Sequence, residues 1–145
     1  MKKILILLQV VVFITLTNCG GYESIYSSKT YDFNVVSIEI DENNEINSKV
    51  KNSLKIFSNL DSGKDIIIKI SSKKKINVTS KDSKGDPKTY AMSINLNLEI
   101  DQNGIKRSST FSETFGYNNK SNKFDLKKYE RNIQNNLTEK IIESI

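Results

Sequence analysis

Four stretches of the chain alternate between apolar and polar residues with the period of two that is typical of β-strands. They cover residues 31–40, 65–80, 90–100 and 105–117. In the first stretch, apolar residues occupy both parities, so we expect either two covered faces or a bulge that shifts the register. One parity there consists of Val36, Ile38 and Ile40, and the other of Phe33 and Val35.

The second strand has one apolar parity and one basic parity. The apolar parity consists of Ile66, Ile68, Ile70, Ile76 and Val78, and is interrupted by Ser72 and Lys74. Likewise, Arg107 and Glu113 interrupt the inner parity of the fourth strand. These interruptions predict that the strand ends extend beyond the core. Between the third and fourth strands, Asn103-Gly104 is a typical hairpin turn.

Two other stretches have the apolar spacing of helices. The first runs from about residue 45 to 58, and the second from 124 to 145 with Asp125 as a possible N-cap. The long helix could lie on a membrane surface or cover a sheet, and we favour the cover because nothing else in the chain can bury the sheet. Its apolar stripe consists of Leu126, Tyr129, Ile133, Leu137, Ile141 and Ile145.

The order of elements predicts an α+β fold, a single two-layer sandwich with the order β-α-β-β-β-α. The first helix should connect two parallel strands by a right-handed crossover, and the last three strands should form an antiparallel meander. The expected sheet is four-stranded and mixed, with two helices on one face. The opposite face, rich in Lys, Ser, Asn and Thr, should meet water or a partner.

The N-terminal segment has the pattern of a bacterial export signal. Lys2 and Lys3 precede an apolar run over residues 4–16, which is too short for a comfortable transmembrane helix. Leu16 and Cys19 occupy positions that resemble the lipobox of bacterial lipoproteins. We therefore expect a signal peptide over 1–18, lipidation of Cys19, a tether over 19–30 and a folded domain over 31–145. The alternative is an ordinary secretory signal with an incidental cysteine.

Composition narrows the function classes. The chain has no histidine, and Cys19 is its one cysteine, so Ser-His-Asp catalysis, thiolate or imidazole metal sites and disulfides are excluded. The formal net charge of +5 falls to +3 once Lys2 and Lys3 leave with the signal, since 20 basic residues then face 17 acidic ones. Such a mild excess does not indicate nucleic-acid binding, but it is compatible with an anionic lipid or protein surface. We expect no enzyme, no cofactor and no metal.

Several motifs together resemble the LPS-assembly lipoprotein (LptE) family. They are Cys19-Gly20-Gly21-Tyr22, the stretch over 89–94, the turn over 101–104 and residues 115–119 leading into Phe124-Asp125. The resemblance covers essentially the whole chain after the signal. It implies a lipid-anchored protein on the periplasmic side of the outer membrane, and Gly20 after the cysteine agrees with that membrane. The implied partner is the LPS-inserting β-barrel (LptD-like), whose lumen such proteins plug, and the implied role is lipopolysaccharide transport.

The resemblance also implies basic residues that contact lipopolysaccharide. Our candidates are Lys73, Lys75, Lys84 and Lys88, because ammonium groups pair with phosphates. The alternative is a solvated basic edge that prevents strand aggregation.

Two other functions stay open. A small periplasm-facing lipoprotein would bind another ligand in an apolar pocket, although we expect core packing to use the apolar stripes fully. A hydrolase would need a converging carboxylate pair.

Overall fold

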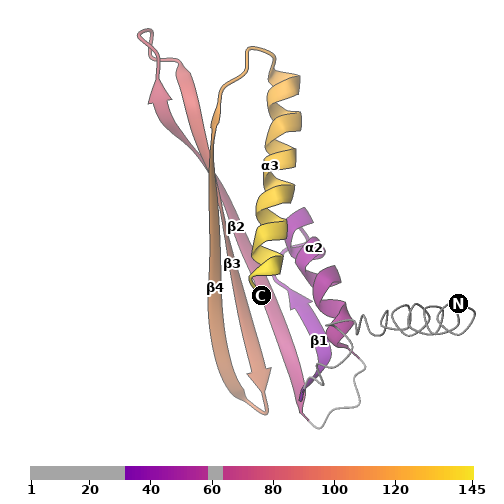
Figure 1. Cartoon of the computed structure of the whole chain (residues 1–145). Coiled ribbons are helices and arrows are strands. Elements are labelled where there is room, and N and C mark those ends of the chain that lie inside the picture. The colour runs from indigo at the N-terminus through magenta and orange to yellow at the C-terminus, as the bar shows by residue number, and fades with distance from the viewer. Residues whose placement is uncertain (1–31, 59–63) are drawn as a thin grey trace, which may run out of the picture. The chain divides into compact units, whose positions relative to one another are not determined.

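The computed structural model describes residues 32–58 and 64–145, which form an α+β domain (Figure 1). The predicted signal peptide, Cys19 and the tether lie outside the described residues. The elements, in chain order, are β1 (Asn34–Ile40), α2 (Glu45–Leu54), the 3-10 turn η1 (Lys55–Phe57), β2 (Asp65–Lys81), β3 (Pro87–Gln102), β4 (Ile105–Asn118) and α3 (Lys123–Glu143).

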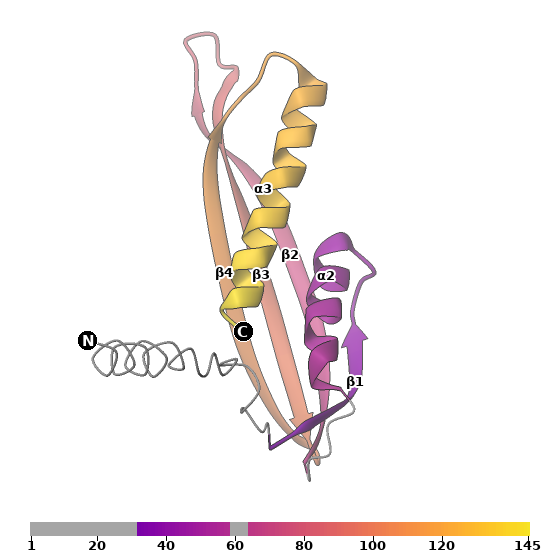
Figure 2. The ribbon, with the colours of Figure 1, turned by 45° about the vertical axis from the view of Figure 1, so that its right-hand side comes forward.

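The four strands form one mixed sheet in the order β1-β2-β3-β4. β1 is parallel to β2, and the pairs β2–β3 and β3–β4 are antiparallel. Both helices lie on the same face of this sheet, α2 over β1 and β2 and α3 over β3 and β4 (Figures 1 and 2). The predicted fold class and element order are therefore confirmed. The face away from the helices is called the outer face below.

A register shift in β1 resolves the ambiguity of its two apolar parities. The pairing with β2 slips between Val35 and Ser37, so Val36 lies at a bulge. Val35 is buried in the core, whereas 59% of Val36 is exposed. The bulge lets Val35 and Ile38 both pack toward the helices although they lie on different parities. Of the two alternatives that the sequence left open, the bulge that shifts the register is therefore confirmed.

β2 is much longer than β1, which pairs only with Asp65–Ile70. Beyond that point, β2 pairs only with β3, and Figures 1 and 2 show these two strands extending past β1 and α2. Ile76 and Val78 are 41% and 44% exposed because no helix covers this part of β2. The continuous β2–β3 register up to Val78 confirms that both share one face with Ile66, Ile68 and Ile70. The expectation that this whole face is dry was wrong, whereas the predicted extension of the strand beyond the core is confirmed.

Helix N-caps come from asparagine side chains. Asn122 caps α3, since its side-chain oxygen accepts hydrogen bonds from the backbone N–H groups of Phe124 (2.9 Å) and Asp125 (3.4 Å). Asp125 is instead a first-turn residue, where its negative charge interacts favourably with the positive end of the helix dipole. The predicted N-cap at Asp125 was therefore wrong. Asn44 caps α2 in the same way, at 2.8 Å from the N–H of Asn47.

The core lies between the sheet and the two helices. α3 contributes much of the predicted stripe to it, which confirms that this helix covers the sheet. Among the described residues, no helix is both long and apolar enough to cross a membrane. The buried apolar residues are Val35, Ile46, Val50, Leu54, Ile66, Ile68, Ile70, Met92, Ile94, Leu96, Leu98, Tyr117, Leu126, Ile133, Leu137 and Ile141.

Candidate functional site

The outer face of the sheet is covered by short polar side chains that hydrogen-bond across strands. On this face, Asn97 Oδ1 accepts from Ser108 Oγ (2.6 Å), and Asn95 Oδ1 accepts from Ser112 Oγ (2.7 Å). One row further, Thr114 Oγ1 donates to Ser93 Oγ at 2.9 Å. Cross-strand pairs of this kind stabilise a sheet without an apolar layer. The result is a hydrophilic, largely uncharged surface over β3 and β4.

Lys73 and Lys75 border this polar surface on β2. Lys73 lies opposite Asn95 and Lys75 lies opposite Ser93 in the β2–β3 register. The two lysines are two positions apart in the strand, so their Cα atoms are about 7 Å apart on the same face. Both side chains are exposed, and neither forms an ion pair with any residue in the described part of the chain. They are therefore available to an anionic ligand or partner.

Lys84 and Lys88 lie elsewhere, at the tip of the β2–β3 hairpin. The tip is closed by Asp82, whose carboxylate accepts from the N–H groups of Lys84 and Asp86, both at 2.9 Å. Acidic and basic side chains alternate there, which lowers the local positive charge. From Lys75 to Lys81 the strand rises by about 20 Å, so the four predicted lysines form two separate groups. Lys73 and Lys75 share one face of β2, whereas Lys84 lies in the turn at the hairpin tip and Lys88 at the start of β3.

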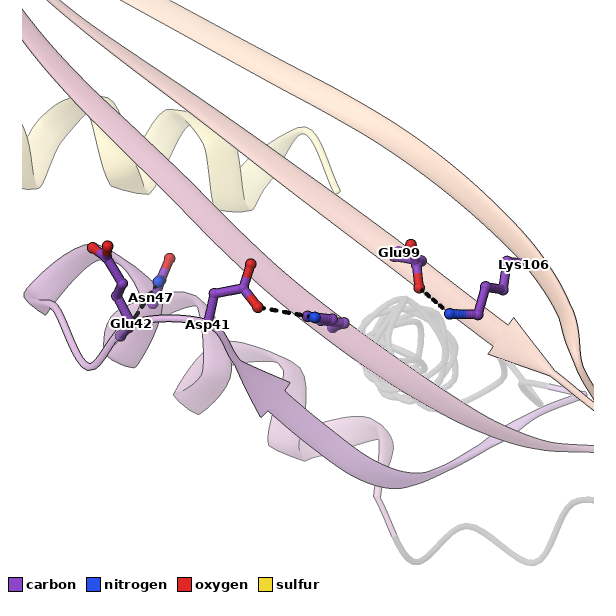
Figure 3. A network of polar contacts seen from close by, with 6 residues as sticks. Asp41, Glu42, Asn47, Glu99 and Lys106 are labelled. Carbon is purple, nitrogen blue, oxygen red and sulfur yellow. Dashed lines mark hydrogen bonds and ion pairs between the residues drawn. The ribbon is translucent and has the colours of Figure 1, made fainter.

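At the opposite end of the outer face, ion pairs neutralise the charges (Figure 3). Lys69 Nζ lies 3.0 Å from Asp41 Oδ1, and Lys106 Nζ lies 2.9 Å from Glu99 Oε1. The hydrogen bond and the charge of Asp41 raise the pKa of Lys69, and those of Glu99 raise the pKa of Lys106. On the outer face of β2, Lys69 is therefore neutralised, whereas Lys73 and Lys75 have no counterion among the described residues.

A buried glutamine connects β2 with both helices. Gln134 on α3 accepts a hydrogen bond from Lys74 Nζ (2.6 Å) and donates one to Glu45 Oε2 (2.9 Å). Beside this junction lies a polar hollow of about 710 Å³, bordered by the end of β1, the start of α2 and the adjoining part of β2. The sequence did not indicate this feature, because Lys74 looked like a simple interruption of an apolar parity.

A second concavity, of about 740 Å³, is apolar and lies between the ends of the two helices and the sheet. Its walls come from β1, the C-terminal part of α2, β2, β3 and the end of α3. The expectation that core packing uses the apolar stripes fully was therefore wrong, because α2 and α3 leave space between their C-terminal ends. Its apolar lining residues are Phe33, Leu54, Ile56, Phe57, Ile66, Ile68, Leu98, Ile100, Ile142 and Ile145.

Three tyrosines cluster where β3 and β4 meet α3. Tyr117 stacks on Tyr90 at 5.5 Å between ring centroids, and its edge meets Tyr129 at 6.0 Å. The Tyr117 hydroxyl donates to Glu130 Oε1 at 2.7 Å. Burial first, and this hydrogen bond second, raise the pKa of Tyr117 well above its usual range. The cluster fixes α3 against the sheet.

Within residues 32–58 and 64–145, no three Cys, His, Asp or Glu side chains are placed to hold a metal ion. The carboxylates of Glu99 and Asp41 bind lysines instead of facing each other. What the described surface offers is an exposed pair of lysines beside hydroxyl and amide groups, which suits binding.

Comparison with known proteins identifies similar solved structures, among them two bacterial lipoproteins. Rare lipoprotein B from Shewanella oneidensis matches with a TM-score of 0.54 at 12% sequence identity, over 74% of this chain and 92% of that chain. The uncharacterized lipoprotein B from Nitrosomonas europaea matches with a TM-score of 0.59 at 11% identity, over 77% and 79% of the two chains. No protein-family model and no curated protein matches the sequence. At these identities the similarity establishes a shared fold.

Proposed function

We propose that this protein is an outer-membrane lipoprotein, lipidated at Cys19, that binds the LPS-inserting β-barrel from the periplasmic side and supports lipopolysaccharide transport. The observation that carries the proposal is a fold shared with proteins named lipoprotein B. It is joined by a lipobox-like segment ending at Cys19 and a solitary cysteine. The role is that of a structural subunit and not of an enzyme.

The outer face of the sheet suits a protein that is enclosed by a barrel. The lumen of an outer-membrane barrel is lined by polar groups and water. The side-chain oxygens of Asn95 and Asn97 already accept hydrogen bonds across the strands, and the amide N–H groups of these residues can donate to a polar wall. An interface of this type is held by hydrogen bonds and bridging water more than by apolar burial.

In this proposal, lipopolysaccharide meets Lys73 and Lys75. Both ammonium groups are exposed on the outer face with hydroxyl and amide neighbours, which can add hydrogen bonds to a phosphate. Lys84 and Lys88 make at most a secondary contact, because Asp82 and Asp86 lie beside them. This assignment separates the two lysine groups that the sequence treated as one.

The test is purification of the tagged full-length chain from detergent-extracted membranes of its own host. The expected result is co-purification of an outer-membrane β-barrel and an increase in mass from acylation at Cys19. The Cys19→Ala variant should lose the acyl chains and be depleted from the membrane fraction. Recovery of the acylated protein without any barrel would overturn the assigned partner, and an unmodified Cys19 in the mature protein would overturn the anchor.

The apolar concavity supports a second candidate function, the binding of an apolar ligand by a periplasm-facing lipoprotein. Its volume of about 740 Å³ lies within the range of small-molecule pockets. The test is titration with a fluorescent fatty acid. Ile100→Trp should fill the concavity and weaken binding, whereas Ile105→Trp, at an exposed position in β4 outside it, should not. Equal binding by both variants would refute this function.

A further inference from the structure

The long strand β2 presents an open edge beside the end of β1. On the β1 side, Lys64 O accepts from Asn34 N (2.8 Å) and Ile70 O accepts from Asp41 N (3.0 Å). The bond to Ile70 is the last between β2 and the β1 segment. From Ser71 onward, the described part of the chain supplies no strand to this side of β2.

The backbone groups on this edge belong to even-numbered residues. Alternate residues of a strand direct their N–H and C=O groups to the same side, so the edge continues from Ile70 through Ser72, Lys74, Ile76 and Val78. The odd-numbered residues between them face β3, with which this segment pairs in continuous register up to Val78. An edge of this kind is a template for another strand.

The side chains beside this edge differ between the two faces. On the outer face, Lys73 and Lys75 are exposed and lack a counterion among the described residues. On the helix face, Ile76 and Val78 are 41% and 44% exposed. Figure 1 shows that β2 extends past α2 in this direction, so α2 does not cover the far part of the strand. A strand added here would place alternate side chains next to ammonium groups and next to half-exposed apolar groups.

We propose that the open edge of β2 from Ser72 to Val78 binds an extended polypeptide segment with alternating apolar and acidic side chains, which joins the sheet in line with β1. The main chain supplies the hydrogen bonds, and the two faces select the side chains. The inference does not depend on the proposed function, because it concerns any partner protein with such a segment.

The same charges disfavour a second copy of this chain as the partner. Two β2 edges brought together would place Lys73 and Lys75 of one copy near those of the other, and like charges across strands are destabilising. Lys74 adds a third positive charge beside this edge. Its ammonium group lies on the helix side, where it donates a hydrogen bond to Gln134. The register also shifts between Val78 and Ser80, which limits the docking edge to the segment before it.

The test uses the full-length chain in nonionic detergent and a blocked peptide of alternating valine and glutamate. Methylation of every second peptide nitrogen leaves the peptide one hydrogen-bonding edge, so it cannot assemble with itself beyond a pair of strands. The expected result is binding, measured by fluorescence anisotropy, with slower hydrogen exchange at the amides of Lys74 and Ile76. A peptide of the same composition with its valines and glutamates in two blocks is the control and should bind more weakly.

Two matched pairs of variants separate the contributions. Ile76→Pro removes an edge N–H that does not bond to β3, and should weaken binding about tenfold more than Ile76→Ala, which keeps that group. Lys73→Glu combined with Lys75→Glu should weaken binding by about tenfold, whereas Lys84→Glu combined with Lys88→Glu at the hairpin tip should change it by less than about twofold. Circular dichroism checks that each variant is folded.

Several outcomes would overturn the proposal. They are no binding of the alternating peptide at about 1 mM, equal binding of the block peptide, and binding without protection of the Lys74 and Ile76 amides. Protection of these amides in the chain alone, rising with its own concentration, would show a second copy as the occupant and contradict the acidic partner. The exchange measurement uses the unmodified chain, so the proposal stays testable even if Ile76→Pro does not fold.

Discussion

At the scale of single residues, Tyr117 shows how the fold changes the chemistry of a side chain. It is 6% exposed, stacks on Tyr90 and donates its hydroxyl proton to Glu130 at 2.7 Å. Ionisation of the hydroxyl would place a negative charge in a buried position next to a carboxylate. That is why burial and the Glu130 hydrogen bond raise the pKa of Tyr117 above the ordinary value of 10.0.

This shift predicts a loss of stability at alkaline pH. Above about pH 10 the unfolded chain releases the Tyr117 proton while the folded chain keeps it, so the free energy of unfolding falls as pH rises further. In Tyr117→Phe this contribution is absent, and its stability should decline less between about pH 9 and 11. At neutral pH the variant should be less stable by about 1 kcal/mol, from the lost hydrogen bond.

Urea unfolding of both proteins across this pH range measures the difference. Tyr90→Phe is the matched control, because it changes a neighbouring tyrosine whose hydroxyl has no hydrogen bond to Glu130. If Tyr117→Phe and the unmodified chain lose stability in parallel above about pH 10, the raised pKa is contradicted.

At the scale of elements, the β3–β4 hairpin is the unit that local sequence specifies best. Asn103 and Gly104 have φ values of 54° and 83°, the left-handed pair that a type I′ turn requires. Asp101 Oδ1 accepts from the N–H of Gly104 at 2.8 Å, which closes the turn. Gln102 and Ile105 pair directly on either side, so the register of both strands follows from this turn.

Gly104→Ala should therefore destabilise the domain by about 1 kcal/mol, because a Cβ atom disfavours the left-handed conformation even though space around it is open. Gly116→Ala in the same hairpin is the control. A Cβ atom there would lie 3.9 Å from Tyr90 O, an ordinary contact, at a position without positive φ. Thermal unfolding should show a lower midpoint for Gly104→Ala alone. Equal midpoints for the two variants would argue against the conformational cost.

At the scale of the whole domain, Gln134 joins three elements that are distant in sequence. Lys74 on β2 and Glu45 at the start of α2 both bond to its side-chain amide, at 2.6 and 2.9 Å. Gln134 is 6% exposed, so its polar groups need these partners. The junction holds the two helices and β2 together at the place where β1 ends.

A double-mutant cycle should reveal coupling across this junction. Lys74→Met and Gln134→Leu each leave a partner without its hydrogen bond, so the double variant should be less destabilised than the sum of the single variants by about 1 kcal/mol. Lys74→Met combined with Ser144→Ala, at the far end of α3, should be additive within about 0.5 kcal/mol. Additivity at Lys74 and Gln134 in urea unfolding would show that the junction contributes no coupling.

The sequence by itself determined the elements, their order and the fold class. Alternation at period two and the helical stripes show which side chains are buried in the folded domain. This information is local, because it can be read from the spacing of apolar residues along the chain. The Asn103-Gly104 turn and the long helix could be predicted for the same reason, since conformational preference and burial of one face are local properties. Of the candidate site, the exposure of Lys73 and Lys75 followed from their shared polar parity.

Only the tertiary structure decided which residues come together. The bulge at Val36, the capping by Asn122 in place of Asp125, and the separation of Lys73 from Lys84 depend on register and on the mismatch between strand lengths. The apolar concavity and the open edge of β2 arise because α2 and β1 are short beside a long sheet. Periodicity shows that a face is apolar, but only the packed elements show whether another element covers it.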